Sequence, residues 1–289
     1  MRPLLIEGKE EHLKMINKYK PRHGEKHLRV LVYGPVGAGK SSFINSVTSA
    51  LGETLCNEAA ANTSDSASSQ SFTVKYETHR IYKDEFDSDE TYPFVFNDIM
   101  GMESGASEGI RPEDIKLVMK GHVKDGYTFN PVAQIQEDNQ YYNPNPKIDD
   151  KVHVLVLMLS ANCLEIDPSV IDKMKEVRET ARDLGIPQLA IGTHIDKACP
   201  EICKDLKNIY RSKYLKTKME EFSKAVGIPL NNIMGVKNYS EETDHVDNID
   251  TLLLIALKHI ITNGLAFVRK QARKADSLAE TMDTLHVKK

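Results

Sequence analysis

The residues best suited to chemistry form a glycine-rich run between an apolar segment and a helical one. The run Gly34-Pro-Val-Gly-Ala-Gly-Lys40-Ser41 matches the pattern G-x-x-x-x-G-K-[ST] at every fixed position. Glycines let backbone N–H groups turn inward around an anion, and the start of the following helix adds a favourable dipole. Lys40 would neutralise the β- and γ-phosphates of a nucleotide, and the Ser41 hydroxyl would bind Mg²⁺. The predicted phosphate-binding residues are Gly34, Gly37, Ala38, Gly39, Lys40, Ser41 and, near the α-phosphate, Ser42. A purely structural glycine turn is the alternative.

A carboxylate in the next part of the chain could complete a magnesium site. In Asp98-Ile-Met-Gly101, Asp98 would hold the water shell of Mg²⁺, and the Gly101 N–H would approach a γ-phosphate. A hydroxyl that senses the same phosphate is expected in the polar loop upstream. The competing hydroxyls are those of Thr63, Ser68, Ser69, Ser71 and Thr73. We favour Ser69 as the additional metal ligand.

A third group of residues is typical of base recognition. Thr193-His194-Ile195-Asp196 lies where guanine-binding proteins commonly carry Asn-Lys-x-Asp or Thr-Lys-x-Asp. The Asp196 carboxylate would accept hydrogen bonds from N1–H and the 2-amino group of guanine, groups that adenine lacks. His194 stands where lysine is usual. Thr193, His194 and Asp196 are therefore predicted to read guanine, with Asn238 supporting the base from the other side. An ordinary strand-exit loop with a capping aspartate is the alternative.

The set of residues needed to cleave a nucleotide is less complete than the set needed to bind one. Small signalling GTPases place a glutamine directly after D-x-x-G to orient the attacking water. Met102 and Glu103 follow Gly101 here. Methionine cannot orient water, so Lys40 and Glu103 are the candidate catalytic residues. We expect slow hydrolysis that depends on a partner or on self-assembly.

Composition narrows the class of protein and its compartment. The chain has 289 residues, a net charge of −4 and a pI of about 6.2, which argues against general nucleic-acid binding. Its four cysteines need no disulfide framework, so a reducing compartment fits. The longest apolar run, at 152–161, is shorter than the ~18–20 residues that a membrane-spanning helix needs. Without a signal peptide pattern, the expectation is a cytoplasmic protein with no membrane insertion.

The elements that must position these residues alternate between strands and helices, which predicts an α/β fold with a mostly parallel sheet flanked by helices. Strands are predicted at 28–34, 72–82, 92–101, 152–160, 187–196 and 232–240. Helices are predicted at about 8–20, from 43 to 51, at 111–123, 167–185, about 204–227 and 248–264, the last ended by Gly264. One domain at 27–268 follows a helical extension at 1–26 and precedes a polar tail at 269–289. An insert at about 124–151 has no clear period and is read as a functional or mobile loop.

Taken together, these motifs resemble the interferon-induced protein 44 family, a branch of P-loop GTPase-like proteins. The matching stretches are GPVGAGKSSFINSV, VFNDIMGM, YTFNP, THID and NYSEE. The resemblance covers roughly residues 20–270. It implies a Ras-like G-domain core, binding of GTP or GDP, a cytoplasmic location and a role in interferon-driven immune responses.

Rival readings of the same residues stay open at this point. A P-loop ATPase or small-molecule kinase would share the phosphate loop but would not depend on Asp196. An interaction scaffold would bind GTP and GDP alike or bind neither. A nucleotide-dependent homo-oligomer would change its mass with a GTP analogue. GTP would order the loop at 53–71 and the insert at 124–151, and so change the surface offered to an unknown protein partner.

Overall fold

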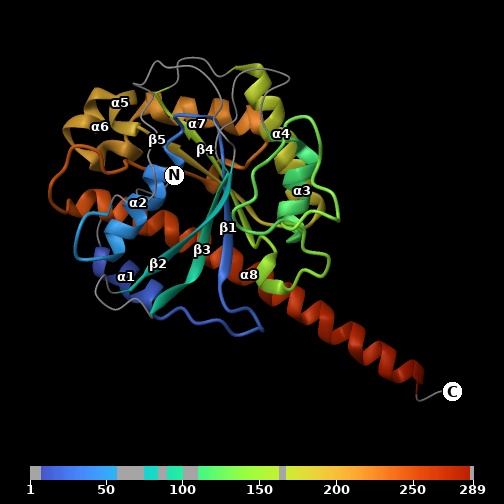
Figure 1. The fold of residues 1–289 in the computed structure, drawn as a ribbon. Coiled ribbons are helices and arrows are strands. Elements are labelled where there is room, and N and C mark those ends of the chain that lie inside the picture. The colour runs from blue at the N-terminus through green and yellow to red at the C-terminus, as the bar shows by residue number, and fades with distance from the viewer. Residues whose placement is uncertain (1–7, 57–74, 84–89, 100–109, 163–166, 287–289) are drawn as a thin grey trace.

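Six strands lie in one sheet in the computed structural model, which describes residues 8–56, 75–83, 90–99, 110–162 and 167–286 (Figure 1). Their order across the sheet is β2-β3-β1-β4-β5-β6, and only the β2–β3 pair is antiparallel. The strands are β1 (Leu28–Tyr33), β2 (Tyr76–Tyr82), β3 (Thr91–Ile99), β4 (Val154–Ser160), β5 (Gln188–Thr193) and β6 (Ile233–Gly235). The predicted α/β class and mostly parallel sheet are confirmed.

Helices cover both faces of this sheet because the strands alternate their apolar side chains between two cores. Val30 and Val32 of β1 face one core, whereas Leu31 and Tyr33 face the other. The helices are α1 (Lys9–Asn17), α2 (Lys40–Leu51), α3 (Pro112–Lys120), α4 (Pro168–Asp183), α5 (Ile195–Ala198), α6 (Pro200–Lys204), α7 (Lys213–Val226) and α8 (Asp247–His286). Short 3₁₀ turns occupy Ile148–Asp150, Leu206–Tyr210 and Leu230–Asn232. The single helix predicted at 204–227 is thus broken into α6, a 3₁₀ turn and α7.

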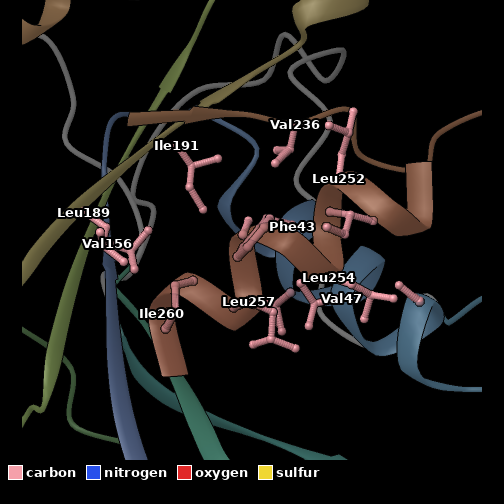
Figure 2. Packing of buried hydrophobic residues seen from close by; sticks show 14 of the residues in the cluster. Phe43, Val47, Val156, Leu189, Ile191, Val236, Leu252, Leu254, Leu257 and Ile260 are labelled. Carbon is pink, nitrogen blue, oxygen red and sulfur yellow. The ribbon is translucent and has the colours of Figure 1, made fainter. Parts of the chain in front are cut away.

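The first core holds the helix that begins at the glycine-rich run. Helices α1, α2 and α8 contribute to it, and α2 and α8 pack against each other and against the sheet. Figure 2 shows Phe43 and Val47 of α2 near Leu254 and Leu257 of α8, with Ile191 of β5 in the same cluster. Burying side chains of this size stabilises a fold by about 1.5–3 kcal/mol each. The start of α2 is therefore fixed rigidly relative to the strand ends.

The second core lies under α3, α4 and α7, and it also receives the predicted insert at 124–151. Tyr127, Phe129 and Ile135 of the insert are buried in it. These buried side chains anchor the insert on the domain, and its response to nucleotide stays a prediction. Its order comes from aromatic and aliphatic burial at irregular spacing, which leaves no periodic signal in the sequence.

The last helix differs most from its predicted bounds. We expected it to end at Gly264 and to give way to a polar tail at 269–289, but α8 continues to His286 and projects from the body in Figure 1. A Cβ at Gly264 would lie 2.9 Å from Val154 Cγ2 and 3.1 Å from Leu28 Cδ1. This glycine allows close approach of the helix to the sheet and does not stop the helix. Within the described residues α8 is also long and apolar enough to cross a membrane by composition alone, yet 61% of the apolar window is buried as core.

We expect Gly264→Ala to lower the free energy of unfolding by about 1 kcal/mol. Alanine favours a helix over glycine by about 1 kcal/mol, but forcing a methyl group into a tight core costs about 1–3 kcal/mol. Urea unfolding measures the difference, and the exposed Thr262→Ala on the same helix serves as the control. A Gly264→Ala protein more stable than the wild type would contradict the close contact with Val154 and Leu28.

Candidate nucleotide-binding site

The glycine-rich run forms a tight turn from the end of β1 into α2. Gly37 and Gly39 have φ values of 76° and 77°, a region that other residues rarely adopt. A Cβ at Gly34 would collide with the carbonyl oxygen of Met158 on β4. Glycine is therefore required at these positions by backbone geometry, in agreement with the predicted anion-binding turn.

The side chain of Lys40 lies inside this turn. Its ammonium donates hydrogen bonds to the carbonyl oxygens of Gly34 at 3.0 Å and Pro35 at 3.1 Å, and the residue is only 7% exposed. Burial lowers the pKa of Lys40, while the nearby Asp98 carboxylate opposes that shift. The loop thus surrounds a buried ammonium group, whose positive charge would attract the phosphates of a nucleotide.

Ser41 and Asp98 meet beside that cation. Asp98 lies on β3 opposite Val32 of β1, and its Oδ2 accepts a hydrogen bond of 2.8 Å from Ser41 Oγ. Asp98 is 3% exposed, and its Oδ1 is buried with no hydrogen-bond partner in the part of the chain that the structure describes. An orphaned carboxylate oxygen next to a serine hydroxyl is the donor set that Mg²⁺ prefers. Two of the three residues predicted to bind the metal, Ser41 and Asp98, are therefore brought together, and they fit it.

Two residues predicted to read the base contact the phosphate loop. The Thr193 hydroxyl is fully buried and donates to the Ala38 carbonyl oxygen at 2.8 Å. Asn238 Nδ2 donates to the Gly39 carbonyl oxygen at 3.0 Å, and its Oδ1 is buried without a partner among the described residues. Thr193 and Asn238 therefore tie the ends of β5 and β6 to the loop.

His194 occupies a special backbone position at the end of β5. Its φ of 53° is the single positive value among the described residues other than glycine. Its Nδ1 lies 3.0 Å from Thr193 Oγ1 and 3.1 Å from Ser160 Oγ on β4. Burial lowers the pKa of His194, Lys197 adds to that shift, and Asp196 opposes it. The ring therefore lies between the ends of β4 and β5, where burial favours its neutral form.

Asp196 follows in the first turn of α5. It is half-buried, and within the described ranges its carboxylate has no hydrogen bond or salt bridge. It therefore remains available as an acceptor at the same edge of the sheet as the phosphate loop.

Sequence reasoning missed an ion pair that flanks this edge. Lys237 and Glu242, which surround Asn238 in sequence, form a half-buried salt bridge. Burial would raise the pKa of Glu242, but Lys237 and the Ser240 N–H outweigh it and lower that pKa to about 2. The spacing of five residues between a lysine and a glutamate was the sequence feature that could have indicated this ion pair. The bridge fixes the turn that carries Asn238.

The structure says less about the other predicted site residues. Ser42 is half-buried at the start of α2, and its carbonyl oxygen accepts a hydrogen bond from Ser46 Oγ at 2.6 Å. Ser69, Gly101 and Glu103 lie outside the described residues. Their roles as metal ligand, γ-phosphate sensor and catalytic group stay predictions.

The sheet order, the antiparallel β2 and the G-x-x-x-x-G-K-[ST] turn between β1 and α2 define the class: a P-loop protein with a Ras-like G-domain fold. No family model matches the chain. Its homologues include interferon-induced protein 44 of Mus musculus, 32% identical over 259 residues, and that of Homo sapiens, 31% identical over 260 residues. These alignments cover 89% of this chain but 59% and 57% of the relatives. Human interferon-induced protein 44-like is 29% identical over 81% of this chain and 51% of its own length.

The resemblance inferred from the motifs is thereby confirmed, and the chain spans less than two thirds of the length of these relatives. Among solved structures, Toc33 from Arabidopsis thaliana in complex with Mg²⁺ and GMPPNP aligns with a TM-score of 0.48 and 13% identity, covering 91% of this chain and 94% of Toc33. Toc33 with GDP and Mg²⁺ gives the same score and identity, over 91% of this chain and 93% of Toc33.

Proposed function

We propose that this protein binds GTP and GDP together with Mg²⁺. The observation that carries the proposal is the pairing of Ser41 with Asp98 beside the buried Lys40 ammonium. A polyphosphate would draw Lys40 away from the Gly34 and Pro35 carbonyls, since charged oxygens make stronger hydrogen bonds than neutral ones. Mg²⁺, when bound, would supply charge that neutralises the phosphates, with Ser41 and Asp98 as its protein contacts.

The preference for guanine rests on Asp196. Its unpaired carboxylate lies after β5, and Thr193 and Asn238 join that edge to the phosphate loop. A carboxylate can accept from both N1–H and the 2-amino group of guanine, whereas adenine would leave it unpaired. This geometry favours guanine over the ATPase alternative.

The wider role follows from the homologues. We infer that the protein takes part in the interferon response, because its relatives are named as interferon-induced proteins. Its place would be the cytoplasm, without membrane insertion. Hydrolysis of GTP would be slow or dependent on a partner, because Met102 stands where signalling GTPases carry glutamine. Lys40 and Glu103 remain the candidate catalytic residues.

Titration calorimetry with GTP, GDP and ATP, each with Mg²⁺ and with EDTA, tests the proposal on the wild-type chain. We expect micromolar or tighter binding of GTP and GDP, at least about 100-fold weaker binding of ATP, and weaker GTP binding in EDTA. Equal affinities for ATP and GTP would favour the ATPase. If no nucleotide produces heat and none shifts the melting temperature, the interaction scaffold becomes the better account.

A further inference from the structure

The insert at 124–151 pairs with the first residues of β2. The Tyr76 N–H donates to the Tyr127 carbonyl oxygen, and the Gly126 N–H donates to the Tyr76 carbonyl oxygen, both at 2.8 Å. Lys75 and Thr128 form an antiparallel bridge beside them. The buried Tyr76 ring meets the Phe129 ring edge-on at a centroid distance of 6.5 Å. The insert is thus hydrogen-bonded to the start of β2 through an isolated antiparallel bridge.

The same insert is also attached to the N-terminal turn of α3. The Ile135 N–H donates to Asp114 Oδ1 at 3.1 Å, and Arg111 Nη1 donates to the Val132 carbonyl oxygen at 3.1 Å. Asp114 is fully buried, and its Oδ2 has no hydrogen-bond partner in the described segments. Burial raises the pKa of Asp114, against the opposing effects of the Ile135 N–H and Arg111. The buried Asp114 carboxyl therefore holds the insert on α3 through its hydrogen bond with the Ile135 N–H.

The far end of the insert is fixed to the other end of α3. The His122 and Tyr142 rings stack at a centroid distance of 5.4 Å. The Asn143 N–H donates to the His122 carbonyl oxygen at 2.8 Å, and Asn143 Nδ2 donates to the Gly121 carbonyl oxygen at 3.1 Å. Contacts at both ends of α3 therefore hold the insert. In Figure 1 the insert lies beside α3.

The attachment to β2 lies beside the candidate magnesium site. In the sheet, Tyr76 pairs with Ile99 and Glu77 pairs with Asp98, so β2 begins beside the metal-binding carboxylate. Helix α3 follows residues 100–109, which include the predicted γ-phosphate sensor Gly101. We propose that the insert is a coupling bridge that makes β2 and α3 respond together to the bound nucleotide, with Asp114 and Arg111 as its positioning residues. This inference rests on the proposed nucleotide binding.

Hydrogen exchange of the full chain, loaded with GDP and Mg²⁺ or with GMPPNP and Mg²⁺, tests the bridge. In the wild type we expect the Gly126 and Ile135 amides to exchange at rates that differ about 10-fold or more between the two states. In Asp114→Ala the difference at Gly126 should shrink at least about threefold, although no residue of that contact is changed. Asp114→Asn keeps an acceptor for the Ile135 N–H, so the difference in exchange rate at Gly126 should return to its wild-type size. Lys116→Ala, an exposed substitution on the same helix, is the control.

Arg111→Ala removes the second contact from a half-exposed position, and it serves if Asp114→Ala does not fold. The bridge is overturned if the phosphate-loop amides respond to the nucleotide while Gly126 and Ile135 do not. It is also overturned if Asp114→Ala and Arg111→Ala both leave the Gly126 difference intact. If the phosphate-loop amides respond to neither nucleotide, the proposed function itself fails and the bridge falls with it.

Discussion

Lys40→Ala is expected to lower the affinity for GTP and GDP by about 100-fold or more. The Lys40 ammonium is buried within the turn and satisfied by two neutral carbonyl oxygens. On binding it would exchange them for charged phosphate oxygens, and hydrogen bonds of that kind contribute about 1.5–3 kcal/mol each. Loss of two such bonds removes about 3–6 kcal/mol, and each 1.4 kcal/mol is a factor of ten in affinity. Titration calorimetry in Mg²⁺ measures the loss.

The control for this variant must separate binding from folding. Alanine leaves the Gly34 and Pro35 carbonyls without their donor, but it also removes a buried charge, so the thermal unfolding of Lys40→Ala should be compared with the wild type. Lys116→Ala removes an exposed lysine on α3 and should bind as the wild type does. If Lys40→Ala is folded and binds GTP within threefold of the wild type, the phosphates lie elsewhere.

Local chemistry explains the parts of the fold that the sequence predicts correctly. The start of α4 is one example: Asp167 accepts from the Ser169 N–H at 2.8 Å, Pro168 opens the helix, and Gly185 beyond its end has a φ of 72°. Each of these effects acts within a few residues of its own position. The turn from Gly34 to Lys40 is predictable for the same reason, since its backbone geometry demands glycine at fixed spacing.

Gly264 shows where local reasoning fails. A glycine after an amphipathic stretch is a common helix end, but here its neighbours are Val154 and Leu28, far away in sequence. The sequence pattern also misses the contacts that hold the insert at 124–151, for a related reason. Its order depends on Tyr76, about fifty residues upstream, and on the buried Asp114. No periodic pattern records such contacts.

The sequence led us to expect several residues of the candidate site at one edge of the sheet, but it did not predict all of their contacts. Ser41 and Asp98 meet as expected, because adjacent parallel strands bring their carboxyl ends to one edge. Thr193 and Asn238 reach the same edge, yet their side chains bond to the loop backbone at Ala38 and Gly39. Those bonds close across 155 and 199 residues, so only the folded chain reveals them.

The half-buried Asp196 makes a sharp test of base choice, because its carboxylate makes no contact that the fold needs within the described part of the chain. Asparagine has nearly the same shape but offers one acceptor and one N–H donor. Against guanine, that donor would face another donor, and a mismatched buried hydrogen bond costs about 1–3 kcal/mol. Xanthine carries a carbonyl oxygen where guanine has its 2-amino group, so an asparagine donor would suit it.

Asp196→Asn is therefore expected to weaken GTP binding by about 10- to 100-fold, to leave ATP binding unchanged and to strengthen binding of xanthosine triphosphate by about tenfold or more. Competition titrations with the three nucleotides in Mg²⁺ measure all three effects in one protein. Asp183→Asn, an exposed carboxylate at the end of α4, is the matched control and should change none of them. Because neither Lys40 nor Ser41 has a hydrogen bond to Asp196 in the described part of the chain, a loss of all nucleotide binding would indicate a collapsed loop. If Asp196→Asn keeps the wild-type order of affinities, another residue chooses the base and the ATPase alternative regains its weight.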